Sequence, residues 1–528
     1  MLYGTKRALL PKNKRHYFVD ATSGNDANSG TSPNKAWQTI AKISTFTFSA
    51  GDTVYLKRGE VWRELWSVNT GGSNGNYVKY KSYGAGAAPK ITGCDLLAPW
   101  ANHAGNVYVA DYVEAISTFL LLEDDVPLTK VANIVAVDAA GKYFPDNPND
   151  KIYCWCTDDA DPDTHTMEIG ARYDTVNCDD RNYVAFDGLH FHGAGGEYGR
   201  GFGAKPTWNT PSNIVLNNCE ISRCFYNGVQ LTHIDAWGPI ENFRLTSCSI
   251  HDNQNTGIWI IGESAAARMT GLIIDSCSVY NNGLAANAAM GIFIDACANP
   301  RVLNCEIYDN NGSLDWSDNL LFGSSSDIEV IGNTIHGGNH TGIHVDVNSN
   351  GQIHRNIIYE CFWNGIWIEE HETAVAGVTT IYNNTCYHNR HGLVFGPGAT
   401  IFEVSGITIK NNIFAYNRRA NVELNEDNVG PDYLNNTINY NCYQTDPSPD
   451  PLYEGEFRAE APRVNKTFAE WKTYTSWDAN SLNEDPLLTD PANQDFTLQD
   501  GSPCINAGVD VGLPYLGAAP DLGYKEKE

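Results

Sequence analysis

The chain has 528 residues and a formal net charge of −28, with 63 acidic residues against 35 Lys and Arg. This balance argues against nucleic acid or anionic membranes as partners, because a basic surface is needed to neutralise their phosphates. With 19% charged residues and 48 glycines, the composition is too apolar for disorder and too Gly-rich for a mostly helical fold, and favours a turn-rich all-β protein.

The N-terminal segment, residues 1–16, is a short basic arm. It lacks the apolar stretch of a secretory signal, and nowhere does the sequence reach the ~18 apolar residues that span a bilayer. We therefore expect a protein that does not bind membranes. It would be extracellular after removal of a signal, or else associated with a virion.

The next two segments differ in regularity. Residues 17–95 predict an N-terminal cap, with a short helix near 37–43, and the first coils of the fold. Residues 96–181 break the later repeat and predict a small β-rich insert, with strands at 131–137 and 151–156. Cys154 and Cys156 in this insert lack a partner pair in the sequence, so their spacing does not predict a zinc or redox site.

Residues 182–425 carry an internal repeat. One phrase, as in Asn218-Cys219-Glu220-Ile221, recurs eight times with its second residue at 219, 248, 277, 305, 333, 356, 384 and 412. A second phrase, a Gly or Asn followed by an alternating strand, begins at Gly228, Gly257, Gly291, Asn319, Gly342, Gly365 and Gly392. A period near 28 residues without amphipathic helices predicts a parallel β-helix, in which successive coils stack ~4.8 Å apart.

Equivalent positions of such coils form files along the molecule. Cys219, Cys248, Cys277 and Cys305 are expected in one inward file, which continues as Asn333, Asn356, Asn384 and Asn412. Side chains that point the same way do not converge on a metal, so this file predicts buried packing with reduced thiols. Residues 426–528 are expected to form an irregular cap over the open end of the coil.

Four further segments of the sequence have a recognisable pattern: the opening residues 17–33, Trp37-Gln-Thr-Ile40, Gly51-Asp-Thr-Val-Tyr-Leu56, and the closing Gly501-Ser-Pro-Cys-Ile-Asn-Ala-Gly508. In these segments the chain resembles the right-handed parallel β-helix proteins of the pectate-lyase-like superfamily. This resemblance implies an all-β, right-handed parallel β-helix with an N-terminal cap, a small insert and a C-terminal cap. It also implies a carbohydrate-active protein, without fixing the activity, because this superfamily hosts many functions.

Candidate site residues follow from the alternation in the second phrase. The second and fourth residues after the Gly should point outward, and the central coils carry acids and aromatics there. The expected catalytic residues are Asp295, Asp346, Glu369, His344 and His371. The expected substrate-binding residues are Trp259, Phe293, Trp367, Asp318 and Glu370. Aromatic rings stack on sugars and carboxylates act as acids and bases, so this face predicts a glycan-binding groove.

The spacing of the acids favours a hydrolase. Asp346 and Glu369 should lie on adjacent coils, whereas Asp295 lies two coils from Asp346, with Gly323 between them. Carboxyl groups of inverting glycosidases are ~6.5–9.5 Å apart, which suits Asp295 with Asp346 or Glu369. Repulsion between Asp346 and Glu369 should raise the pKa of one of them. The favoured function is hydrolysis of a neutral or weakly charged polysaccharide or oligosaccharide, without a cofactor.

Two alternatives stay open. A polysaccharide lyase would use His344 or His371 as the base, with Ca²⁺ bound by Asp295, Asp346 and Glu369. A phage tailspike or other virion protein would attach through the basic arm and would form a homotrimer rather than a monomer.

Overall fold

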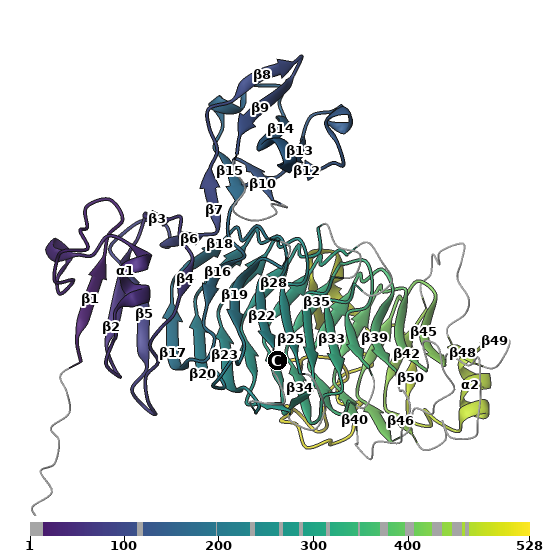
Figure 1. The fold of residues 1–528 in the computed structure, drawn as a ribbon. Helices are drawn as coiled ribbons and strands as arrows, with labels where there is room; N and C mark the ends of the chain where they lie inside the picture. Colours follow the sequence, from purple (N-terminus) through teal and green to yellow (C-terminus); the bar gives the residue numbers. More distant parts are fainter. Residues whose placement is uncertain are drawn as a thin grey trace, which may run out of the picture.

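The molecule is a coil of three parallel sheets that run side by side along its length (Figure 1). The computed structural model describes residues 14–112, 120–196, 198–232, 238–262, 268–284, 289–312, 317–346, 349–369, 379–396, 406–424, 436–445, 457–459 and 464–528. Each coil contributes one strand to each sheet, and each strand pairs in parallel with its equivalent in the next coil. The predicted all-β parallel β-helix is therefore confirmed.

We name the sheets A, B and C in the order in which a coil visits them. Sheet A runs from β1 (His16–Val19) to β46 (Thr437–Asn439), and sheet B from β3 (Val61–Trp62) to β50 (Leu482–Asn483). Sheet C contains the strands of the second sequence phrase. Its described strands are β4 (Trp66–Ser67), β16 (Asp174–Asn177), β19 (Arg200–Ala204), β22 (Val229–Thr232), β25 (Ile258–Ile261), β29 (Ile292–Asp295), β33 (Leu320–Gly323), β36 (Ile343–Val345), β39 (Asn364–Ile368), β42 (His391–Phe395), β45 (Ala420–Leu424), β48 (Phe457–Ala459) and β49 (Val464–Lys466).

The corner between sheets A and B explains the first sequence phrase. Its first residue takes a left-handed conformation in every coil, as at Asn218 (φ 51°) and Gly332 (φ 69°), which favours Asn, Ser and Gly. Its second residue points into the coil. Cys219, Cys248, Cys277 and Cys305 are all buried, so the predicted inward file is confirmed. All fourteen cysteines are buried free thiols.

Asparagines continue that file as a hydrogen-bonded ladder. The Asn356 side chain donates to Val330 O and Asn384 Oδ1, each at 2.9 Å, and accepts from the Asn333 backbone and side-chain amides. Asn384, Asn412 and Asn441 repeat the arrangement. The ladder therefore satisfies buried polar groups that the tight corner leaves without a strand partner.

A second ladder lies at the corner between sheets B and C. Asn253 donates to Asn282 and Asn282 to Asn310, each at 2.9 Å. Asn310 then donates to Asn319, and further along Asn389 donates to Asn417. The regular repeat is interrupted at Asn319, which instead donates to the carbonyl oxygens of His336 and Gly337. The coil that follows Asn319 spans the short 23-residue step from Asn333 to Asn356.

Helices close the two ends of the coil. Helix α1 (Ile40–Thr45) is capped by the Thr39 side chain and buries Ile40 and Ile43. It begins three residues after Trp37, because Trp37 forms a bridge with Val19. Helix α2 (Phe468–Thr475) has a capping box and stacks its buried Trp471 on Phe457 at 4.9 Å. No described helix combines the length and apolar character needed to cross a membrane.

The insert forms two small sheets that project from the coil near β6 (Lys90–Thr92) and β18 (His190–His192) (Figure 1). One sheet contains β7 (Cys94–Leu96), β10 (Leu121–Glu123), β11 (Val126–Pro127) and β15 (Met167–Gly170). The other contains β8 (Ala101–Ala104), β9 (Val107–Asp111), β12 (Thr129–Lys130), β13 (Lys142–Asp146) and β14 (Lys151–Trp155). The strand predicted at 131–137 is instead a 3₁₀ turn, η2 (Ile134–Ala136), which Asn133 caps.

Candidate active site

The outward files on sheet C have the register that the sequence predicts. Phe293 pairs with Leu321, Leu321 with His344, and His344 with Trp367. In the other file Asp295 pairs with Gly323, and Asp346 and Glu369 come directly after β36 and β39. Stacked equivalent positions therefore bring the acids and rings of separate coils to one face.

His344 lies at the centre of this face and links two carboxylates. Its Nδ1 donates to Asp318 Oδ2 at 2.8 Å, and its Nε2 donates to Glu369 Oε2 at 3.1 Å. Burial would lower the pKa of His344, but the charge of Asp318 and the two hydrogen bonds raise it to about 9. The imidazole is therefore a buried cation between two acids at neutral pH.

The second carboxylate oxygen of Asp318 holds a further histidine. His340 Nδ1 lies 2.5 Å from Asp318 Oδ1, and the Thr341 backbone N–H donates to the same oxygen at 3.1 Å. Burial would raise the pKa of Asp318, but the charges and hydrogen bonds of both histidines hold it well below its usual range. Asp318 is thus an ionised anchor for His340 and His344.

Burial corrects the sequence-based picture of an open face. The side chains of His344, Glu369 and Asp318 are 0% exposed. His344 is covered because Trp367 stacks on it, with ring centroids 4.2 Å apart and an angle of 9° between the planes. Asp318, which the sequence predicts to bind substrate, holds His340 and His344 through its two carboxylate oxygens.

Asp346 and Glu369 form a close acidic pair on adjacent coils. One carboxylate oxygen of each, together with a ring nitrogen of His344, lie within 4.8 Å of one another. Asp346 is partly exposed, whereas Glu369 is buried. Stacking of adjacent coils therefore brings these two carboxylates together.

Asp295 lies two coils away but interacts with Asp346. Burial raises the pKa of Asp295, and the negative charge of Asp346 raises it further. Gly323 occupies the intervening coil, and a Cβ there would lie 3.1 Å from Asp295 Oδ1. The missing side chain at Gly323 therefore leaves the room that the Asp295 carboxylate occupies.

The predicted aromatic residues divide into two places. Trp259 and Phe293 are neighbours, with ring centroids 4.7 Å apart. Trp367 lies beyond Leu321 and His344 in the same file, and one face of its indole is taken by His344. That face of Trp367 is therefore not available to a sugar. Glu370 and His371, the remaining predicted site residues, lie outside the described residues.

Several polar residues at the margin were missed from the sequence. Glu423 continues the file one coil past Val394, so extending the register would have found it. It lies 3.1 Å from His391 Nε2 and 2.9 Å from the Arg458 guanidinium. Arg390 lies 3.8 Å from the centre of the Trp363 ring. Lys and Arg are thus scarce in the outward files, as the sequence predicts, but Arg390 and Arg458 lie beside these files.

The acids of the site do not suit calcium well. Ca²⁺ takes six to eight oxygen ligands, whereas Glu369 here accepts a hydrogen bond from a charged imidazole. A cation at this position would have to displace the proton that joins His344 to Glu369. The residues therefore fit a proton-sharing network better than a calcium site.

Comparisons with known proteins agree with the fold. Residues 240–378 match the family model described as a right handed beta helix region. The uncharacterised protein YwoF of Bacillus subtilis (strain 168) is 21% identical over 284 residues. That match covers 50% of this chain and 53% of the relative, so the chain spans about half the length of this curated protein. The resemblance to right-handed parallel β-helix proteins is confirmed.

Three solved structures are similar along much of their length. XylC in complex with xylose superposes with a TM-score of 0.61 at 15% identity, covering 90% of this chain and 87% of the other. Pectate lyase Pel9A gives 0.50 at 15% identity, covering 98% and 97%. A glycoside hydrolase gives 0.53 at 10% identity, covering 73% and 97%. At these identities the similarity establishes a fold shared with carbohydrate-active enzymes.

Proposed function

We propose that this protein is a glycoside hydrolase that acts with retention of configuration, using Asp346 and Glu369 as its catalytic pair. The observation that carries the proposal is the approach of these two carboxylates to within 4.8 Å. Retaining enzymes hold their carboxyl groups ~5–5.5 Å apart, whereas inverting enzymes need ~6.5–9.5 Å for a water. The sequence favours a pair with Asp295; we propose Asp346 and Glu369 because an oxygen of each lies within 4.8 Å of the other.

The hydrogen bonds assign a role to each acid. Glu369 shares a proton with His344, which is itself held by Asp318. This contact lets Glu369 give up a proton and recover one, which a general acid and base must do. Asp346 is the partly exposed member of the pair, so its carboxylate can reach a sugar bound at this face. It therefore takes the role of nucleophile.

The reaction proceeds in two balanced steps. An Asp346 oxygen attacks the anomeric carbon while the glycosidic C–O bond breaks. The proton that His344 donates to Glu369 passes through the Glu369 carboxylate to the departing oxygen, and His344 becomes neutral. The Glu369 carboxylate then removes a proton from water, whose oxygen attacks the same carbon and releases Asp346. Two inversions give net retention, and one water is consumed per bond cleaved.

The substrate is expected to be a neutral glycan. The acidic residues of the face and the net charge of −28 would repel a polyuronate. The partly exposed rings of Trp367 and Trp363 offer surface on which a sugar ring can stack. The similar XylC structure contains xylose, so xylose-containing substrates are the first to test on this chain.

A panel of aryl glycosides and oligosaccharides, led by xylosides, tests the proposal. Retention predicts that proton NMR first detects a product with the configuration of the substrate. Because the proposed mechanism uses no metal, added Ca²⁺ should leave the rate unchanged. A product of opposite configuration would contradict the Asp346–Glu369 pair. Unsaturated-uronate absorbance from pectic or alginate substrates would indicate a lyase, and no cleavage together with a trimer on sizing would favour the virion protein.

A further inference from the structure

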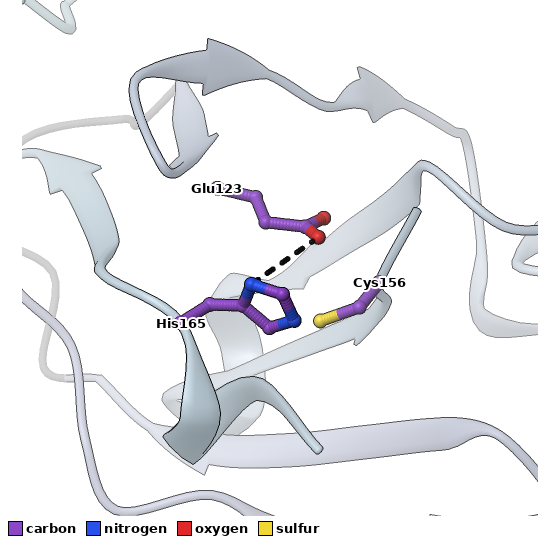
Figure 2. A group of neighbouring side chains, drawn as sticks. All are labelled: Glu123, Cys156 and His165. Carbon is purple, nitrogen blue, oxygen red and sulfur yellow. Dashed lines mark ion pairs between the residues drawn. The ribbon is translucent and has the colours of Figure 1, made fainter. Parts of the chain in front are cut away.

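We propose that the insert binds one zinc-type transition-metal ion through Glu123, Cys156 and His165. These residues come from three separate segments. Glu123 ends β10, Cys156 follows β14, and His165 follows the 3₁₀ turn η4 (Pro162–Thr164). Figure 2 shows the three side chains pointing toward one another, with the Glu123 carboxylate 3.8 Å from His165 Nδ1 and the Cys156 sulfur beside the opposite ring nitrogen. One ligand atom of each lies within 4.8 Å of the others.

The chemistry of these donors selects the metal. A thiolate, an imidazole and a carboxylate are the ligands that Zn²⁺ takes in proteins, whereas Ca²⁺ and Mg²⁺ require oxygen. Glu123 and Cys156 are 3% and 0% exposed, and the side chain of His165 is 14% exposed. Three metal-binding groups of different types are thus gathered in a site that is nearly closed to solvent.

His165 is held in the manner of a metal-ligating histidine. Its Nδ1 lies 2.7 Å from Asp124 Oδ2, so this nitrogen carries the donated proton. The opposite nitrogen, Nε2, is buried and forms no hydrogen bond, and it lies on the side of the ring that faces the Cys156 sulfur (Figure 2). A histidine that binds a metal through one nitrogen usually donates the other N–H to a carboxylate.

The other ligands are also oriented by neighbours. The Glu123 carboxylate accepts hydrogen bonds from the backbone N–H and the hydroxyl of Thr157, the latter at 2.8 Å. Asp158 Oδ1 lies 3.2 Å from His165 Nε2 and is a further oxygen at the edge of the site. Asp124 owes its position to the β10–β11 hairpin, where it and Asp125 both have positive φ, as a two-residue type I′ turn requires.

A neighbouring cluster shows what this site lacks. Asp125, Glu168 and His192 also lie within 4.8 Å of one another. There, however, Lys90 and Arg223 lie near Asp125, and Arg63 pairs with Glu168. Cations that already neutralise the carboxylates make this second cluster an ion-pair network. Within the described part of the chain, no Lys or Arg forms an ion pair with Glu123, Asp124 or Asp158.

The site also has a structural purpose. The insert has its own small core, which includes Tyr143, Ile152 and Met167 and is separate from that of the coil. Domains with so little apolar interior are often stabilised by a metal or a disulfide. An ion held by Glu123, Cys156 and His165 would join both sheets of the insert, since β10 and β14 belong to different ones.

Metal binding by the full-length chain tests the proposal. Reduced, metal-free protein should bind one equivalent of Zn²⁺, and Co²⁺ should give a thiolate-to-cobalt charge-transfer absorption. Cys156→Ser and His165→Gln should remove that absorption. Asp124→Asn, which changes only the residue that orients His165, should weaken binding about 10–100-fold. At free metal about 100 times the dissociation constant, unfolding of the insert should become about 100-fold less favourable.

Two matched variants control the experiment. Cys248→Ser alters a buried thiol of the coil, and His192→Gln alters the neighbouring ion-pair cluster. Both should keep the full equivalent of metal. Absence of stoichiometric Co²⁺ or Zn²⁺ binding, or a charge-transfer absorption that survives Cys156→Ser, would overturn the proposal. Far-UV circular dichroism identifies any variant that fails to fold, and Asp124→Asn then supplies the decisive comparison.

Discussion

His344 shows how one residue can combine folding and chemistry. It is a buried cation between Asp318 and Glu369, and its ring is covered by Trp367. A buried charge is tolerated only when its partners satisfy it, and here both ring nitrogens are hydrogen-bonded. The same bonds that stabilise the imidazolium also orient Glu369 and supply it with a proton partner.

Removal of either acid of the proposed catalytic pair should abolish most activity. Glu369→Gln is expected to lower kcat about 10²–10⁴-fold, because the leaving group loses its proton donor. Asp346→Asn should lower the rate at least as much, since no covalent intermediate can form. Added azide should restore turnover of an activated aryl glycoside in both variants, with inverted product only for Asp346→Asn.

Asp327→Asn, which alters an exposed acid just before a sheet A strand, is the control. Near wild-type rates for both site variants would remove the acids from the mechanism.

The raised pKa of His344 predicts a pH-dependent stability. Its value of about 9 lies above the ordinary 6.5 of an unfolded histidine. The charged form therefore stabilises the fold fully below pH ~6.5, and this contribution is lost as pH rises through about 9. Between those limits the wild-type free energy of unfolding should fall by on the order of 1–3 kcal/mol. Urea titrations of wild type and His344→Gln at several pH values measure the difference, and parallel pH profiles would contradict the charged imidazole.

At the scale of elements, the coil is organised by its corners. Left-handed residues turn the chain, and the asparagine ladders saturate the polar groups that the turns leave inside. The candidate site lies where the ladder between sheets B and C is interrupted, at Asn319 and the short coil that follows. Asp318 and His340 flank this interruption, so the irregular corner supplies polar groups that a regular coil would have used for stacking.

An asparagine of the ladder should contribute more to stability than a cysteine of the same file. Asn356→Ala removes the acceptor of the Asn333 backbone and side-chain amides and the side-chain donor to the carbonyl oxygen of Val330. Each buried group left without a partner costs about 1–3 kcal/mol. Cys277→Ala removes a weak thiol contact and a small volume, and should cost less. Thermal midpoints of the two variants, measured side by side, check this order. Equal midpoints would mean that the ladder is only incidental to packing.

At the scale of the whole molecule, the insert is attached to the coil by charge. Asp125 accepts a hydrogen bond from His192 Nε2 at 2.7 Å and lies near Lys90 and Arg223. Burial would raise the pKa of Asp125, but the bond from His192 and the nearby cations hold it well below its usual range. Glu168 and Arg63 form a second link between insert and coil.

Loss of the Asp125 contact should loosen the insert without unfolding the coil. A hydrogen bond to a charged group contributes about 1.5–3 kcal/mol, so Asp125→Asn should speed hydrogen exchange in the insert about tenfold or more. Exchange in the strands of sheet C should stay unchanged. Asp111→Asn, which alters an exposed acid within the insert, serves as the control. Equal protection in Asp125→Asn and wild type would show that apolar contacts alone hold the insert.

Much of this architecture is determined by the sequence itself. Each coil contacts its neighbours in sequence, so the repeat fixes the register, the inward cysteines and asparagines, and the alignment of Asp295, Asp346 and Glu369. Local conformational rules explain the phrase that marks the corner, since its first residue must tolerate a left-handed backbone. A regular solenoid makes long-range structure nearly a local property, and pattern alone can therefore predict it.

Only the tertiary structure decided the chemistry of the sites. Whether an outward residue is exposed depends on what covers it, and Trp367 buries His344 through a neighbouring coil. The separation of two carboxylates depends on side-chain direction, which the coil spacing does not give. The insert has no repeat, so nothing in the spacing of Cys154 and Cys156 reveals Glu123 or His165. Those residues meet because two small sheets fold against each other, and such convergence depends on packing between segments that are distant along the chain.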